Sequence, residues 1–425
     1  EYPLEEISDE IREIGRYVAQ LVNDGSTVQL GIGRIPHAVA ECLHEKKDLG
    51  IHTEMFTDGI IDLVKSGAVT GKQKTINRRK IVASFVLGTK RLFDFIHRNP
   101  LVELHPSEYV NDPLVISQHD NMVAINVALE IDLTGQVCAD SLGYRFYSGI
   151  GGQVDFIRGA SHSKGGKPII AMPSTAKNGE ISRIVSHLSE GAGVVTTRGD
   201  VHYVVTEYGI ADLHGRNIRE RAMSLIGIAH PKFRNQLLKE AKKLHYVYKD
   251  QIELPWDKIE YPKKYEATMN LSDGTSVHYR PIKPADEEAL RDMFYSLSEQ
   301  SIYLRFFMPL REMSHQRAQP LVSVDYKDEL AIVGTIQELS GEKLIAVGRY
   351  IKNPGTSTAE VAFLVRDEWQ GRGIGTFLFG YLVKIAKENG FTGLTAEVLL
   401  ENKSMLQLFY NSPYQITSKF EEGVY

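Results

Sequence analysis

The sequence has 425 residues, of which 42% are hydrophobic and 24% charged, with a formal net charge of -5 and two cysteines. These values exclude a disordered or fibrous chain, a basic nucleic-acid-binding surface and a disulfide scaffold, and the length predicts two or three domains. No apolar run reaches the ~18 residues of a membrane-spanning helix, and no CxxC or His-rich spacing indicates a metal site, so we expect a cytoplasmic protein without metal or membrane.

The first predicted elements are a helix, a buried strand and a glycine turn. Ser8 is the predicted N-cap of the helix. After Ser8, apolar residues are spaced as on one face of a helix: Ile11, Ile14, Val18, Leu21 and Val22. Residues 27–33, TVQLGIG, indicate a strand that ends in a Gly-Ile-Gly turn, and Pro36 is placed to open the next helix.

Five later runs are nearly continuous in apolar residues, which is typical of strands covered on both faces of a sheet. They are residues 80–88, 121–129, 167–173, 191–197 and 202–209. Because amphipathic segments separate them, we predict an open α/β domain with a parallel or mixed sheet over residues 1–250.

Residues 245–269 interrupt this pattern with two prolines, mixed charge and scattered aromatic residues. We predict a semi-rigid linker at residues 251–269, a domain boundary near residue 260 and a second α/β domain at residues 270–425. Within that domain, residues 344–367 indicate two strands joined by an Asn-Pro-Gly turn, and therefore a hairpin.

The clearest local motif follows a strand that is predicted to end near Val365. It consists of Gln370, Gly371, Arg372, Gly373, Ile374 and Gly375, and it leads into a helix. Glycines let a backbone approach a phosphate closely, and the free N–H groups at a helix start attract negative charge. A plain tight turn is the alternative, because a GxG turn alone is a weak signal.

This motif resembles motif A of the GNAT acetyltransferases, and residues 270–425 follow that family's order of elements. The similarity is greatest to the protein-lysine acetyltransferase subgroup, through RPIKPADEEALRDMFYSLSEQSIYLRFF and AEVAFLVRDEWQGRGIG. The resemblance implies an acetyl-CoA site at Val365 and Gln370–Gly375 and a protein-lysine partner. An amine must lose a proton before it attacks a thioester. Glu360 is the candidate base, and a solvated carboxylate is the alternative. Phe409 stands where many members have a Tyr.

Five stretches within residues 5–244 resemble the acetyl-CoA hydrolase/transferase group of class I CoA-transferases, and most closely its 4-hydroxybutyrate/acetate-type enzymes. They are VQLGIGRIPHAV, LGIHTEMFTDG, YSGIGGQVDFIRGA, PSTAKNGEISRI and VVTEYGIADLHGRNIRERAMSLIGIAHPKFR. The resemblance implies that Glu54 is a covalent nucleophile. Its attack on an acyl-CoA gives an acyl-glutamyl anhydride, and CoA then returns to form a glutamyl-CoA thioester. A small carboxylate finally takes the CoA.

The same resemblance assigns supporting roles. The family's CoA-contacting turn is matched by Gly31, Ile32, Gly33, Arg34 and Ile35. Gln29 is a candidate hydrogen-bond donor beside Glu54. A glycine loop whose N–H groups can form an oxyanion hole is matched by Gly149, Gly151 and Gly152. The alternative for this loop is a turn that needs positive φ.

The resemblance covers the second of two related α/β halves, and the chain begins at Glu1 instead of Met. We therefore expect a processed or truncated piece, and a GNAT fold that stops before its last strand. Three functions stay open: a CoA-transferase with an appended GNAT domain, a protein-lysine acetyltransferase whose first domain senses CoA esters, and a CoA-binding regulator without turnover. We favour the first, because its motifs imply a covalent mechanism and cover more of the chain. We also expect a homo-oligomer; the acyl group stays open.

Overall fold

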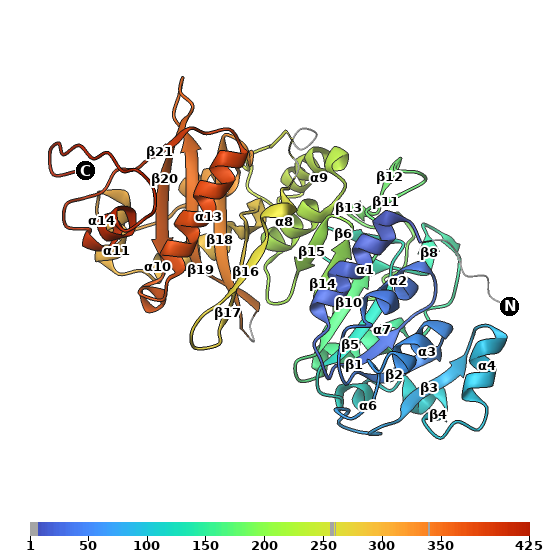
Figure 1. Ribbon diagram of the computed structural model, residues 1–425. Helices are drawn as coiled ribbons and strands as arrows, with labels where there is room; N and C mark the ends of the chain where they lie inside the picture. The colour runs from blue at the N-terminus through green and yellow to red at the C-terminus, as the bar shows by residue number, and fades with distance from the viewer. Residues whose placement is uncertain (1–6, 256–258, 260, 339–340) are drawn as a thin grey trace. The chain divides into compact units, whose positions relative to one another are not determined.

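The computed structural model describes residues 7–255, 259, 261–338 and 341–425, in two compact units (Figure 1). The first unit is Glu1–Lys249 and the second is Asp250–Tyr425. No helix in these described ranges is long and apolar enough to cross a lipid bilayer.

An eight-stranded sheet forms the centre of the first unit, in the order β15-β14-β10-β5-β1-β2-β3-β4. Its strands are β1 (Thr27–Leu30), β2 (Gly50–Phe56), β3 (Ile81–Val86), β4 (Val102–Leu104), β5 (Met122–Val127), β10 (Lys167–Ala171), β14 (Tyr203–Thr206) and β15 (Gly209–Asp212). Neighbouring strands are parallel except β14 and β15, which are antiparallel. The prediction of a parallel or mixed sheet is confirmed, with β14 and β15 making it mixed, and the carboxyl ends of its parallel strands lie along one edge.

Helices cover both faces of this sheet. One face carries α1 (Asp9–Leu21), α2 (Arg34–Cys42), α3 (Asp58–Lys65) and α4 (Lys90–Ile96). The other carries α5 (Ser107–Val110), α6 (Pro113–Ser117) and α7 (Gln153–His162), while α8 (Ile218–Ile228) and α9 (Pro231–Lys243) pack near β15. The Ser8 hydroxyl accepts a hydrogen bond from the Ile11 N–H, which confirms Ser8 as the N-cap of α1.

Short strands decorate the first unit. They are β6 (Glu130–Asp132), β7 (Val137–Cys138), β8 (Ser141–Leu142), β9 (Arg145–Phe146), β11 (Thr175–Ala176), β12 (Ile181–Ser182) and β13 (Ile184–Val185). The expected strand at residues 191–197 is wrong, since only Thr196 makes an isolated bridge there. Gly191 has φ +82°, and the Ala192 N–H closes a turn onto the Ser189 carbonyl, so the run starts as a turn.

The second unit contains a six-stranded sheet in the order β16-β17-β18-β19-β20-β21. Its strands are β16 (Ala267–Asn270), β17 (Ser276–Pro281), β18 (Glu329–Glu338), β19 (Gly341–Lys352), β20 (Thr358–Val365) and β21 (Gly393–Thr395). All neighbours are antiparallel except β20 and β21. The predicted hairpin is β19 and β20, and the strand that precedes the glycine motif ends at Val365 as expected.

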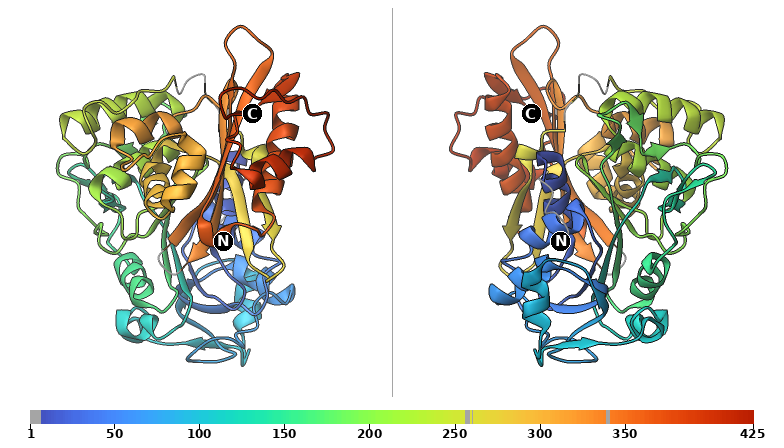
Figure 2. Two further views of the ribbon diagram at one scale, coloured as in Figure 1. Left: turned by 90° about the vertical axis from the view of Figure 1, so that its left-hand side faces the viewer. Right: turned by 90° about the vertical axis from the view of Figure 1, so that its right-hand side faces the viewer.

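Two helical layers lie on opposite faces of this sheet (Figure 2). One layer is α10 (Glu287–Tyr295), α11 (Glu299–Phe306) and α12 (His315–Val322), and the other is formed by α13 (Ile374–Glu388). The short α14 (Lys403–Tyr410) and the 3-10 turns η1 (Lys263–Tyr265), η2 (Pro284–Asp286) and η3 (Asp367–Trp369) complete the unit. Side chains of β20 alternate between the layers: Phe363 packs on Phe379 of α13, and Leu364 faces the α10 side.

The described part of residues 251–269 differs from the expected linker. Leu254, Ile259 and Tyr265 are buried in the core of the second unit, and β16 begins at Ala267. These apolar side chains gain more from burial than an exposed spacer would allow. The units therefore divide after Lys249 instead of near residue 260. Residues 1–6, 256–258 and 260, which the predicted domain and linker include, lie outside the described residues.

Candidate active sites

Glu54 lies near the carboxyl end of β2, at the sheet edge where open α/β proteins bind ligands. Its Oε1 accepts a hydrogen bond from Asn111 Nδ2 at 2.9 Å, and its Oε2 accepts one from the Gly152 N–H at 3.2 Å. Asn111 follows α5, and Gly152 is the N-cap of α7. Segments 57 and 98 residues away in sequence thus orient one carboxylate.

The missing side chain of Gly152 leaves room for the Glu54 carboxylate and the Asn111 amide. A Cβ atom there would lie 2.7 Å from Glu54 Oε2 and 2.7 Å from Asn111 Nδ2. Its N–H also belongs to a helix start, whose partial positive charge favours a carboxylate. Among the described residues, a Cβ atom on Gly149 or Gly151 would meet nothing within 4 Å, and Gly151 has φ +60°. Of the three predicted glycines, the structure brings Gly152 to Glu54.

Gln29 does not act as the predicted donor to Glu54 in this structure. Its Oε1 accepts hydrogen bonds at 3.0 Å from the Ile125 N–H and from Asn126 Nδ2, so its buried amide joins β1 to β5. The side-chain donor to Glu54 is Asn111, in the role that was predicted for Gln29. Sequence reasoning missed it, because its short helix gives no catalytic signal; the Asp112-Pro113 helix start after it was the available hint.

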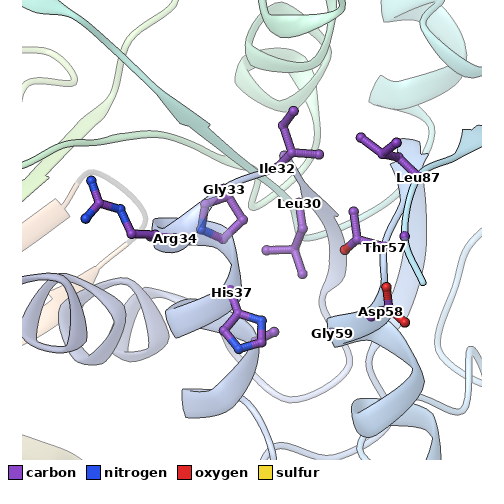
Figure 3. A pocket seen from close by; sticks show the side chains of 13 residues that line it. Leu30, Ile32, Gly33, Arg34, His37, Thr57, Asp58, Gly59 and Leu87 are labelled. Carbon is purple, nitrogen blue, oxygen red and sulfur yellow. The ribbon is translucent and has the colours of Figure 1, made fainter. Parts of the chain in front are cut away.

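The two glycine turns that flank Glu54 in the sequence line one pocket on the α2 and α3 side of the sheet (Figure 3). The lining includes Gly31, Ile32, Gly33 and Arg34 after β1, Thr57, Asp58 and Gly59 after β2, and Leu87 and Gly88 after β3. Asp58 accepts hydrogen bonds from the N–H and hydroxyl of Thr89, at 2.8 and 2.7 Å, which ties two of these loops together.

This pocket separates the predicted residues into two groups. Gly33 has φ +98° and is the N-cap of α2, so N–H groups of the helix start border the pocket. Ile35 instead packs in the core and does not line it. Glu54 is also absent from its lining, because the partners of Glu54 come from α5 and α7 on the other face. The glycine turn and the predicted nucleophile Glu54 therefore lie on the two sides of one sheet edge.

A buried layer of basic side chains lies below Glu54 on its own face of β2. His52 is fully buried, its Nε2 lies 2.8 Å from the Val110 carbonyl, and burial lowers its pKa to about 4. The His119 ring lies 4.7 Å from that of His52, and burial lowers the His119 pKa as well. Burial also lowers the pKa of Lys74 to about 7. Asp155 of α7 lies above this layer. Its pKa is raised mainly by burial, and the nearby Glu54 carboxylate raises it further.

The glycine motif of the second unit forms an open loop between η3 and α13. Gly371 and Gly373 have φ +72° and +84°, and a Cβ at either would meet no atom of the described part of the chain within 4 Å. Gln370 Nε2 donates to the Val365 carbonyl at 3.1 Å, which closes the loop onto the end of β20. Arg372 pairs with Asp273 at 2.9 Å. Gly373 caps α13 without a side-chain bond, so the helix N–H groups face the loop.

Two further predicted residues differ in their surroundings. Ile374 is buried in the core, and a Cβ on Gly375 would make ordinary contact with Leu408 at 3.5 Å. Glu360 is exposed in β20, opposite Ile351 of β19 and Thr395 of β21. The pairing of β20 with β21 ends at Glu360, whose partner Thr395 is the last residue of β21.

Two protein families match separate parts of the chain. Residues 88–241 match the acetyl-CoA hydrolase/transferase C-terminal domain, and residues 291–411 match the acetyltransferase (GNAT) family. The chain joins an acetyl-CoA hydrolase/transferase C-terminal domain to a GNAT domain. Both predicted resemblances are confirmed. The first match contains Asn111 and Gly152, and the GNAT match contains Glu360 and the loop at 370–375.

Relatives of the hydrolase/transferase domain include several CoA-transferases. The chain is 55% identical over 237 residues to a 4-hydroxybutyrate coenzyme A transferase of Clostridium kluyveri, covering 56% of this chain and 55% of the relative. It is 53% identical over 234 residues to a succinyl-CoA:cyclohexane-1-carboxylate CoA transferase of Geobacter metallireducens, covering 55% and 54%. The chain thus spans about half the length of the curated relatives it matches.

A solved structure supports the same fold for this domain. The 4-hydroxybutyrate CoA-transferase of Porphyromonas gingivalis is 47% identical, with a TM-score of 0.51, over 57% of this chain and 58% of that chain. The carboxylates named for these three relatives range from 4-hydroxybutyrate to cyclohexane-1-carboxylate. The similarity therefore extends across enzymes with different acyl groups.

Proposed function

We propose that this chain is part of a CoA-transferase that moves CoA from an acyl-CoA to a short-chain carboxylate through a glutamyl-CoA thioester at Glu54. The observation that carries the proposal is the carboxylate of Glu54 held between Asn111 Nδ2 and the Gly152 N–H, at the carboxyl ends of the parallel strands of the sheet. Identity of 55% to a 4-hydroxybutyrate coenzyme A transferase supports the reaction class.

The proposed chemistry conserves the activated bond. A Glu54 oxygen attacks the thioester carbonyl, the C–S bond breaks, and an acyl-glutamyl anhydride and CoA thiolate result. The thiolate attacks the glutamyl carbonyl and releases the acyl group as a carboxylate. An acceptor carboxylate then attacks the glutamyl-CoA thioester, which releases CoA thiolate and forms a second anhydride. The thiolate attacks the acceptor's carbonyl in this anhydride and gives the new acyl-CoA. Glu54 regains its carboxylate.

Asn111 and Gly152 would act when negative charge moves onto the Glu54 carbonyl oxygen. In both tetrahedral intermediates at this carbon, the oxygen that accepted a hydrogen bond as a carboxylate becomes an oxyanion. Donors already in place stabilise such charge without reorganisation. The pocket that contains Gly31–Arg34 would receive CoA, whose phosphates suit the free N–H groups at the start of α2.

Borohydride reduction tests the intermediate. The purified chain is incubated with acetyl-CoA or butyryl-CoA, reduced, and measured by intact mass spectrometry. A glutamyl-CoA thioester would become an alcohol, so the chain would lose one oxygen and gain two hydrogens. Glu54→Ala should abolish this change, and Glu45→Ala, at an exposed position of the same unit, should retain it. An unchanged mass in the parent chain would contradict the proposed intermediate.

A second proposed activity is acetyl transfer to an amine by the GNAT domain, with a protein lysine as the acceptor. The observation in its favour is the open loop at Gly371 and Gly373 followed by the uncapped start of α13, which suits the pyrophosphate of acetyl-CoA. Acetylation of lysine peptides would be followed with Glu360→Gln as the test of the base. If acetyl-CoA binds at the sites of both domains and neither reaction occurs, the result would instead favour a CoA-binding regulator without turnover.

A further inference from the structure

A cavity in the GNAT domain lies between the helical layer α10–α12 and the sheet face of β19 and β20. Its lining is mainly apolar and includes Phe294, Phe306, Met313 and Leu364. Two arginines, Arg305 of α11 and Arg349 of β19, also line it. The loop at Gln370–Gly375 contributes no lining residue, so this cavity is separate from the proposed acetyl-CoA loop.

Arg349, which lines this cavity, has one buried hydrogen-bond donor without a partner among the described residues. Its side chain is only 8% exposed, and its Nη2 donates to Glu329 Oε1 at 2.8 Å and to the Leu321 carbonyl at 3.0 Å. Its Nε is buried and has no hydrogen-bond partner among the described residues. A buried donor without an acceptor costs free energy, which an added acceptor recovers.

Arg305 provides a second, poorly compensated charge. In the described part of the chain its guanidinium has no carboxylate in ion-pair contact, and it lies 5.1 Å from the centre of the Phe306 ring. Burial lowers the pKa of Arg305 to about 10, the charge of Arg349 lowers it further, and Glu360 partly opposes this. Two guanidinium groups in one apolar cavity favour the entry of an anion.

We propose that this cavity binds a small monocarboxylate such as acetate, recognised by Arg305 and Arg349. The planar guanidinium group matches a carboxylate, and charge-assisted hydrogen bonds are the strong ones. The cavity measures about 30 Å³, which exceeds the about 10–15 Å³ that a single water needs, so it admits a solute larger than one water. Its apolar wall at Met313 and Phe294 suits a short alkyl group. The site goes beyond the proposed transfer reactions and does not depend on Glu54.

NMR of the full chain with 13C-labelled methionine methyl groups tests this site locally. Met313 lines the cavity and is 3% exposed, and its signal is assigned with Met313→Leu. Acetate replaces chloride at constant ionic strength. We expect a saturable shift of the Met313 signal, while Met269 in β16 reports the fold of the same unit. Acetamide, a neutral molecule of the same shape, should leave the Met313 signal in place.

Arg305→Gln should weaken acetate binding by roughly tenfold or more, because one charged hydrogen-bond donor group is lost. Arg317→Gln, at an exposed position of α12, should bind acetate as the parent chain does. If Arg305→Gln disturbs the Met269 signal, Arg305→Lys retains the charge without the planar group and should still weaken binding. An unmoved Met313 signal, an equal response to acetamide, or unchanged affinity in the Arg305 variants would each overturn the proposal.

Discussion

The glycine loops of the two domains show the same residue type used for different physical reasons. At Gly152 the limit is contact, since a Cβ atom would meet the side chains of Glu54 and Asn111 at 2.7 Å unless they move. Gly371 and Gly373 are required by backbone conformation, with φ +72° and +84°, and the space around them is open. The first site therefore depends on segments far apart in sequence, and the second on a local turn.

Gly152→Ala should give the largest effect. The added methyl group would displace the Glu54 carboxylate or the Asn111 amide, and the loss of one aligned donor costs about 10²–10³-fold in kcat. The rate of CoA transfer between acyl-CoA and acetate measures this. Gly149→Ala is the matched control, because nothing lies within 4 Å of its Cβ position. Equal loss in both variants would break the contact argument.

Asn111→Ala removes a donor without adding bulk. A hydrogen bond to a charged group contributes about 1.5–3 kcal/mol, so we expect roughly a 10- to 150-fold loss in kcat. The free energy of unfolding, measured with urea, should change much less than the activation free energy. A variant with full activity would show that the reaction does not depend on the 2.9 Å hydrogen bond from Asn111 to Glu54.

Lys74→Met tests the buried layer of basic side chains below Glu54. Burial lowers the pKa of Lys74 to about 7 from 10.5, and its Nζ donates to the Ile51 and Lys80 carbonyls. Between these values the unfolded chain binds more protons than the folded chain, so stability rises with pH. The slope from this group is at most about 1.4 kcal/mol per pH unit.

We therefore expect the free energy of unfolding of the parent chain to rise, relative to Lys74→Met, as the pH increases from about 7 to about 10. Urea titrations at several pH values measure the difference. Lys72→Met, at an exposed position, should show no such trend. A pH-independent difference would mean that Lys74 titrates alike in both states.

Gly373→Ala should give the smallest effect. A non-glycine residue at φ +84° is strained by about 1–2 kcal/mol, but the open space around the position leaves the loop accessible. We expect a stability loss of this size and less than roughly tenfold weaker acetyl-CoA binding. Calorimetric titration with acetyl-CoA checks the affinity. A complete loss of binding would show that the loop, like Gly152, is limited by contact.

The sequence predicted local features well because they depend on neighbouring residues. Ser8 caps α1, and β20 ends at Val365 before the glycine motif. The same reasoning was wrong at residues 191–197, where glycine conformation overrides the apolar pattern. It also treated residues 251–269 as a spacer, although Leu254, Ile259 and Tyr265 are buried in the core of the second unit.

By itself the sequence determined that two α/β domains with CoA-related motifs follow one another, and it singled out Glu54 and the loop at 370–375. Only the tertiary structure decided that Asn111, and not Gln29, donates to Glu54, and that Gly152 is the loop glycine beside it. The reason is physical: motifs and periodicity report short separations along the chain. Side chains 57 or 98 residues apart meet only when helices α5 and α7 pack on the same face of the sheet.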